Sequence, residues 1–112
     1  MEKEFYYNVR VRIREKDSIY DEYFGRGIAQ LLHGVKEYHS LNLSAKNMGM
    51  AYSKAWRVIK EAEEALDMVL LHRMGQKGSS LTEEAEQFLA VYEEAEKEAV
   101  GAVQKVFKQY YG

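Results

Sequence analysis

The chain has no cysteine and no proline among its 112 residues. The lack of cysteine excludes disulfide frameworks, zinc–thiolate sites, iron–sulfur clusters and thiol catalysis, and it is compatible with a reducing compartment. Without proline, nothing interrupts a long helix. No apolar run approaches the roughly 20 residues of a membrane span, and no signal-type apolar stretch follows the charged start. These absences predict a cytoplasmic protein with no membrane contact, built as one domain over residues 1–112.

Charge is distributed unevenly, although the net charge is only −2. Residues 1–39 are neutral overall, residues 40–80 carry a net charge of +2, and residues 81–112 carry −4. A positive middle region is compatible with a nucleic-acid partner, because the local field rather than the total charge governs encounter.

Residues 5–14 alternate between apolar and polar side chains. The apolar face carries Phe5, Tyr7, Val9, Val11 and Ile13, and the other face carries Arg10, Arg12 and Arg14. This period of two predicts a half-buried strand, and a second apolar run at 19–24 predicts an N-terminal β-hairpin over 5–24. We interpret the arginines as protection of an exposed edge strand, with an accessory phosphate contact as the alternative.

Helical spacing follows over residues 26–80. It predicts helices over 26–39, 43–48 and 51–66, with Leu43, Ala45 and Met48 available for the core from the second helix. The third helix has an inner face of Ala55, Ile59, Ala62 and Leu66. A short helix, a turn with a glycine and a longer helix with basic residues near its start are typical of a helix-turn-helix. A strand over 69–73, a glycine- and serine-rich loop over 74–80 and a return at 81–82 then predict the wing of a winged helix.

The last helix is predicted over 82–110, with Thr82 as its N-cap. Its apolar positions recur every seven residues, and several are alanines that allow close approach of a second helix. We interpret these positions as a homodimer interface, with packing on the chain's own domain as the alternative: Ala85, Phe88, Leu89, Tyr92, Ala95, Ala99, Ala102, Val103, Val106 and Tyr110.

The run over residues 49–57, GMAYSKAWR, is the most distinctive motif of the chain. It resembles the start of the recognition helix in the DNA-binding domain of the ModE family of molybdate-responsive transcription regulators, a LysR-like winged helix-turn-helix. The runs at 25–32, 71–78 and 81–85 resemble the family's first helix, wing and linker helix. The family wing has more glycines, and its regulators carry C-terminal oxyanion-binding domains, for which a chain ending at Gly112 has no room. The resemblance therefore implies a stand-alone DNA-binding domain with no molybdate site.

The first turns of a recognition helix meet base edges or phosphates, and a wing follows the backbone of the duplex. The residues expected to contact double-stranded DNA, from the second helix to the wing, are Ser44, Lys46, Tyr52, Ser53, Lys54, Arg57, Lys60, Arg73 and Lys77. Capping or solvation is the alternative for Ser44 and Lys46, and an ion pair is the alternative for Arg73. Trp56 is expected in the core.

The predicted fold is mainly α with a small β component: a winged helix-turn-helix with an N-terminal β-hairpin and a long C-terminal dimerisation helix. The predicted function is sequence-specific DNA binding in transcription regulation, without enzymatic activity, metal or cofactor. The three histidines share no metal-ligand spacing, and no nucleophilic triad or phosphate loop occurs. The alternative is a protein-interaction module with weak or no DNA binding, which the acidic last third favours.

Overall fold

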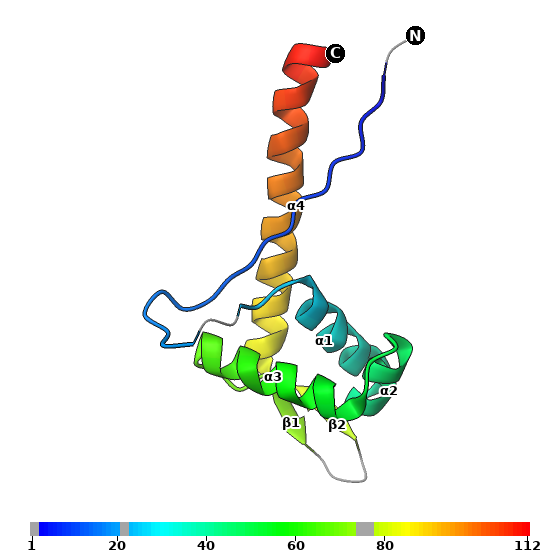
Figure 1. Ribbon diagram of the computed structural model, residues 1–112, viewed down its shortest axis with the longest axis vertical. Helices are drawn as coiled ribbons and strands as arrows, with labels where there is room; N and C mark the ends of the chain where they lie inside the picture. The colour runs from blue at the N-terminus through cyan, green and yellow to red at the C-terminus, as the bar shows by residue number, and fades with distance from the viewer. Residues whose placement is uncertain (1–2, 21–22, 74–77) are drawn as a thin grey trace.

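The computed structural model describes residues 3–20, 23–73 and 78–112. Its order of elements matches the predicted winged helix-turn-helix: three helices, a two-stranded antiparallel sheet and a long last helix (Figure 1). The bounds are α1 Arg26–Tyr38, α2 Leu41–Asn47, α3 Tyr52–Leu66, β1 Leu71–Arg73, β2 Ser79–Leu81 and α4 Glu83–Tyr111. No helix in this described part of the chain is long and apolar enough to cross a membrane.

The core lies where α1, α2 and α3 meet the first turns of α4. Each helix contributes the apolar residues that its spacing placed on one face, so the predicted inner face of α3 is confirmed. Fully buried members include Phe24, Leu31, Leu32, Val35, Ala45, Ala55, Ile59, Ala62, Leu70 and Ala85. At about 1.5–3 kcal/mol for each large apolar side chain, this burial is the main stabilising contribution to the domain.

The second helix begins earlier than the sequence predicted. It starts at Leu41, because the Ser40 side chain accepts a hydrogen bond from the backbone N–H of Leu43 at 3.1 Å and so caps the helix. The Leu43 side chain faces outward and is 50% exposed, so its predicted place in the core is wrong.

Helices α1 and α2 approach each other closely at Gly34. The Ser44 side chain of α2 lies against this glycine, and its hydroxyl donates a hydrogen bond of 2.7 Å to the carbonyl oxygen of Leu31. A Cβ atom at residue 34 would stand 2.6 Å from the Cβ of Ser44, well inside contact distance. Glycine is therefore required for this helix–helix contact.

The predicted N-terminal hairpin is wrong over most of its length. In the described residues up to Phe24, only Ile13 and Phe24 form a β-bridge, through N–H···O bonds of 2.9 and 2.7 Å. The register of this bridge explains why residues 5–12 do not pair with a second strand. Residues before 13 could pair only with residues after 24, where the chain has already entered α1.

Residues 3–13 instead form an extended strap that runs beside α4 toward its free end (Figure 1). The Tyr92 hydroxyl donates to the carbonyl oxygen of Val11 at 2.9 Å, and the Arg26 guanidinium donates to that of Val9 at 3.0 Å. The apolar face that alternation predicted is thus used against a helix rather than in a sheet.

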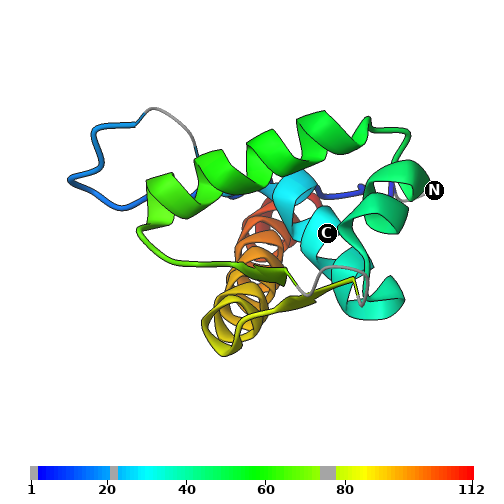
Figure 2. The same cartoon turned by 90° about the horizontal axis from the view of Figure 1, so that it is seen from below.

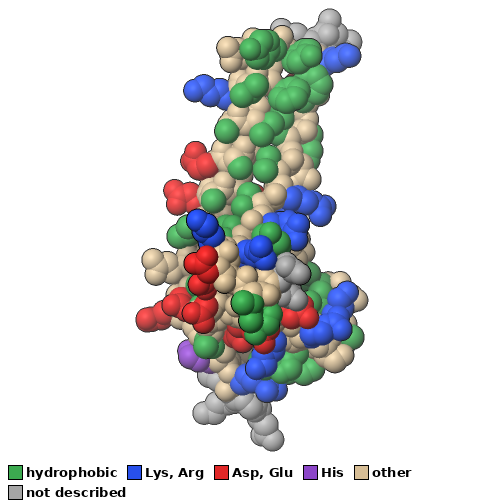
Figure 3. All heavy atoms as spheres, turned by 60° about the vertical axis from the view of Figure 1, so that its left-hand side comes forward, with side chains coloured by type: hydrophobic (Ala, Val, Ile, Leu, Met, Phe, Trp, Pro, Cys, Tyr) green, Lys and Arg blue, Asp and Glu red, His purple; other side chains and the backbone are tan. Residues whose placement is uncertain are grey.

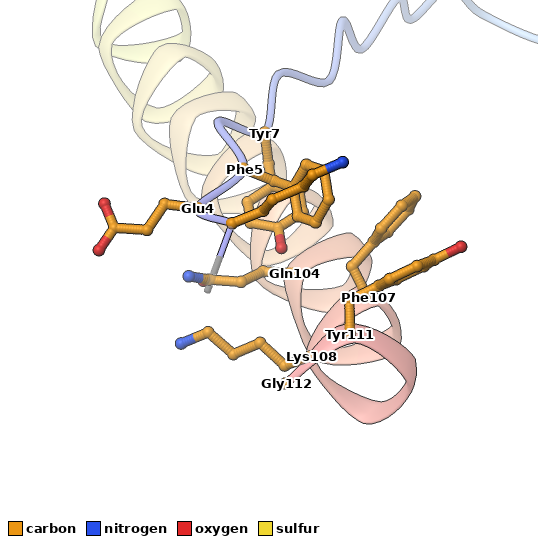
Figure 4. A pocket seen from close by; sticks show the side chains of 9 residues that line it. Glu4, Phe5, Tyr7, Gln104, Phe107, Lys108, Tyr111 and Gly112 are labelled. Atoms are coloured by element: carbon orange, nitrogen blue, oxygen red, sulfur yellow. The ribbon is translucent and has the colours of Figure 1, made fainter. Parts of the chain in front are cut away.

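Aromatic rings join the strap to the last turns of α4 (Figure 4). The Phe5 ring lies 6.0 Å from the Phe107 ring and 5.7 Å from the Tyr111 ring, measured between centroids, and the Tyr7 ring lies 5.8 Å from Phe107. The Phe5–Tyr111 pair is edge-to-face and the other two pairs are tilted, and aromatic pairs at such distances add roughly 0.5–1.5 kcal/mol each beyond area burial. They hold the two ends of the described chain together, far from the helix-turn-helix.

Candidate DNA interface

The turn between α2 and α3 sets the direction of the recognition helix. Gly49 adopts a positive φ of 67°, and the backbone N–H of Met50 donates to the carbonyl oxygen of Ala45 at 2.8 Å. A left-handed residue followed by a hydrogen bond back to the preceding helix is a compact helix ending. The chain then re-enters a helix at Tyr52, so α2 and α3 form the predicted helix-turn-helix.

Helix α3 has a buried and an exposed face. Ala55, Ile59 and Ala62 are completely buried, whereas Ser53, Lys54, Arg57 and Lys60 are exposed, and Tyr52 is 43% exposed. No hydrogen bond or ion pair within residues 3–20, 23–73 and 78–112 engages the charged ends of the three cations. The structure thus brings Ser53, Lys54, Arg57 and Lys60 together on one accessible face, and Tyr52 is exposed beside it at the start of the helix.

The charges of α3 are segregated along its length. The cations come first, from Lys54 to Lys60, and the acidic side chains Glu61, Glu63 and Glu64 follow them. Glu63 is already engaged, because its carboxylate accepts a hydrogen bond of 2.8 Å from the backbone N–H of Leu70. The start of a helix also carries a partial positive charge from its backbone dipoles, so the most positive part of α3 is the end nearest the turn.

The two predicted residues of α2 have different positions. Lys46 is exposed and remains available to a phosphate. Ser44 is only 1% exposed and donates its hydroxyl proton to the carbonyl oxygen of Leu31. The predicted contact of Ser44 with a phosphate is therefore wrong, because a buried hydroxyl that is already hydrogen-bonded cannot reach DNA. The spacing within α2 could not show this, since the glycine that covers Ser44 belongs to α1.

The wing is the antiparallel pair β1–β2, with Leu71 opposite Leu81, His72 opposite Ser80 and Arg73 opposite Ser79. Lys77, predicted to contact DNA from the tip, lies outside the described residues. The loop end of the wing is fixed to the end of α1, since the Ser79 N–H donates to the carbonyl oxygen of His39 at 3.0 Å.

Gly78 makes this anchoring possible. Its φ is +95°, and an added Cβ atom would collide with the carbonyl oxygen of His39. His39 is itself left-handed, with φ 56°, where it ends α1. The orientation of the wing therefore depends on a backbone contact that only glycine permits.

Trp56 links the recognition helix to the wing. The ring packs against the core but is only partly buried, so its predicted place in the core is confirmed in part. The guanidinium carbon of Arg73 lies 4.4 Å from the ring centroid. This is the geometry of a cation–π contact. Arg73 thus stacks on Trp56, whereas the alternative prediction for this residue was an ion pair.

A hollow of about 390 Å³ lies between the start of α2, the start of α3 and the loop end of the wing. These three elements adjoin one another on the face seen in Figure 2. The lining residues are Ser40, Leu41, Asn42, Tyr52, Arg73, Gly78 and Ser79. Sequence reasoning missed Ser40, Asn42 and Ser79, because no local spacing relates them to one another.

The predicted dimer interface divides into two parts. Ala85, Leu89 and Tyr92 are at most 3% exposed within a single chain. Phe88 packs with its centroid 4.9 Å from that of Phe24. These four residues belong to the chain's own core, so the prediction that they form part of the dimer interface is wrong. We call the remaining residues the distal seam, and they lie beyond the domain: Ala95, Ala99, Ala102, Val103, Val106 and Tyr110.

Tyr92 is the titratable residue among these four core residues, and its pKa is shifted. Burial raises the pKa of its hydroxyl above the usual 10.0, and the charge and hydrogen bond of Glu96 raise this pKa further, while Arg26 opposes the shift. The neutral hydroxyl can therefore donate to the carbonyl oxygen of Val11 at all ordinary pH values. Tyr92 thereby ties α4 to the strap.

No group of three or more His, Cys, Asp or Glu side chains in the described part of the chain is arranged to hold a metal ion. Residues 29–86, just over half of the chain, match the model of the family described as bacterial regulatory helix-turn-helix protein, lysR family. A search of curated proteins gives no match.

Proposed function

The chain belongs to the lysR family of bacterial regulatory helix-turn-helix proteins, whose role is DNA-binding transcription regulation, and we propose that it recognises a specific sequence of double-stranded DNA through the first half of α3. The observation that carries this proposal is the exposed surface of α3, where Ser53, Lys54 and Arg57 lie opposite a completely buried face and Tyr52 is exposed at the start of the helix. A helix of this kind fits the major groove, where the base pairs are distinguishable.

Each side chain has a proposed role that follows from its chemistry. Arg57 is the candidate for base recognition, because a planar guanidinium can donate two hydrogen bonds to one guanine. Lys54 and Lys60 act as phosphate contacts beside it, and Lys46 acts as one from α2. Within the lysR family we propose a ModE-like affiliation, which rests on the run GMAYSKAWR at residues 49–57 and on the wing sequence that follows.

We further propose that two copies associate through the distal seam. The stalk of α4, residues 93–111, extends beyond the domain, and the strap covers one side of it (Figure 1). Along the seam, Val103 is 37% exposed, Val106 54% and Tyr110 74%. A second helix would remove this apolar surface from water, and the alanines would allow close approach.

The charges of α4 favour an antiparallel arrangement of the two helices. Glu94 and Glu98 outnumber Lys97 on the half of the stalk nearer the domain, and Lys105 and Lys108 lie near the free end. Figure 3 shows the same order on one face of the molecule, with acidic side chains nearer the domain and a basic one nearer the tip. Antiparallel helices would place the acidic half of each copy against the basic half of the other, whereas parallel helices would align like charges.

The dimer is tested by placing one carboxylate in the seam. Ala102→Glu should shift the sedimentation of the protein from dimer toward monomer, because the carboxylate would be buried in an apolar contact. Ala90→Glu is the matched control, since Ala90 is exposed on the opposite face of the same helix. Dissociation by both variants, or by neither, would argue against the seam as the interface.

The recognition surface is tested with a duplex carrying a selected binding site and a scrambled duplex of equal length. Arg57→Ala should weaken binding to the selected duplex by about 1–3 kcal/mol and have a smaller effect on the scrambled one. Arg10→Ala is the matched control, because Arg10 is an exposed arginine on the strap. Equal losses on both duplexes would show that Arg57 contacts phosphate and does not read bases.

A further inference from the structure

The hollow between α2, α3 and the wing has the character of an anion site. None of the lining residues that the structure describes is acidic, and Arg73 supplies a permanent positive charge to the wall of the hollow. Tyr52, Asn42 and Ser79 add side chains that can donate hydrogen bonds. Tyr52, the first residue of α3, lines the hollow, so a duplex bound along the start of this helix would bring its backbone to this point.

Arg73 does not stand freely in this wall. Its guanidinium carbon lies 4.4 Å from the centroid of the Trp56 ring, and Trp56 is held in turn by the apolar core. An exposed arginine without such a contact samples many rotamers and loses that freedom when it binds. A stacked guanidinium keeps its N–H groups at the edge of the plane free to bind phosphate, so the contact restricts Arg73 without occupying it.

We propose that Trp56 is a positioning residue that presets Arg73 to bind one phosphate of the DNA backbone in this hollow. The inference rests on the proposed function and adds to it a residue that touches neither base nor phosphate. It also gives the contact between α3 and β1 a role, because the same ring joins the recognition helix to the wing.

A double-mutant cycle tests the inference with a labelled duplex of mixed sequence at low salt, since a phosphate contact does not depend on sequence. Trp56→Leu and Arg73→Ala should each weaken binding by roughly threefold to fivefold. The double variant should bind no more weakly than Arg73→Ala alone, because Trp56 acts only through Arg73. If Trp56→Leu costs as much in the Arg73→Ala background as in the wild type, the ring has a merely structural role and the inference fails.

Conservative variants keep the test independent of folding. Trp56→Phe preserves an aromatic face and should recover most of the lost affinity, and Arg73→Lys should not, because an ammonium group lacks the planar stack. Thermal unfolding of each variant checks that the domain is intact. Failure of Trp56→Phe to bind better than an equally folded Trp56→Leu would overturn the role of the ring.

The only tryptophan of the chain gives a second readout that needs no DNA. In the free protein, Arg73→Ala should change the fluorescence of Trp56, and Arg10→Ala should not. An unchanged spectrum would contradict the stacking itself. If the wild-type protein binds no duplex but its emission still responds to Arg73→Ala, the proposed function is refuted. The stacking of Arg73 on Trp56 would then exist without a role in DNA binding. Binding with an additive cycle would refute only the role of Trp56.

Discussion

Substitution of Gly34 by alanine tests the helix–helix contact on which the position of α2 depends. The added Cβ atom would stand 2.6 Å from the Cβ and 3.1 Å from the Cα of Ser44, whereas carbon atoms in good contact lie about 3.5–4.0 Å apart. It would lie closer still to the Ser44 hydroxyl, which is buried and bonded to the carbonyl oxygen of Leu31. Helix α2 must therefore move away from α1, or the hydroxyl must give up its hydrogen bond.

The expected cost follows from three contributions. Overpacking of a tight contact destabilises by roughly 1–3 kcal/mol. Disturbance of the Ser44 hydrogen bond adds about 1 kcal/mol. Replacement of a helical glycine by alanine returns up to about 1 kcal/mol through helix propensity. Gly34→Ala should thus lower the free energy of unfolding by about 1–3 kcal/mol, a large part of the total for a small domain.

Urea unfolding followed by circular dichroism measures this change. Gly27→Ala is the matched control in the same helix, because an added Cβ there meets no atom within 4 Å, so it should be neutral or slightly stabilising. In a Ser44→Gly background, which removes the colliding atoms, Gly34→Ala should lose most of its cost. If Gly34→Ala behaves like Gly27→Ala, the close approach of α1 and α2 is refuted.

Two further predictions concern the wing and the strap. Gly78→Ala should weaken binding to every duplex while leaving the helices folded, because the new methyl group collides with the carbonyl oxygen of His39 and tilts the wing; DNA affinity beside far-ultraviolet circular dichroism checks it, and unchanged affinity would contradict it. The neutral form of Tyr92 is favoured in the folded state, so its contribution to stability should be complete below pH 10.0 and lost as pH rises through the higher pKa of the folded protein. The difference in unfolding free energy between wild type and Tyr92→Phe should therefore shrink above pH 10.0, and parallel curves would count against the buried hydroxyl.

Features governed by neighbouring residues could be predicted from the sequence. The spacing of apolar residues located α1, α3 and α4 to within a residue or two, and the motif at 49–57 pointed to the recognition helix. The exposed cations of α3 follow from the same spacing, because residues opposite a buried face must meet solvent. For α2, the prediction overlooked Ser40 as the cap, so the start of the helix was placed too late.

Features that depend on distant residues could not be predicted. Alternation identified an extended segment at residues 5–14 but not its partner, which is α4 rather than a second strand. The repeat along α4 predicted an apolar face, but the repeat is the same whether that face meets its own core or a second chain. The burial of Ser44 beside Gly34 depends on α1, and the stacking of Arg73 on Trp56 joins residues of different elements.

The central claim, recognition of a specific DNA sequence by α3, is tested most directly by selection of bound duplexes from random DNA at near-physiological salt. Recognition by a dimer predicts enrichment of a two-fold symmetric motif. Its half-sites should be separated by about one helical turn of DNA, roughly 34–36 Å, or by a multiple of this distance. Protein carrying Arg57→Ala should then enrich the same motif with a relaxed base position. Failure of folded, dimeric protein to enrich any sequence would contradict the claim and favour a winged helix that serves protein interaction.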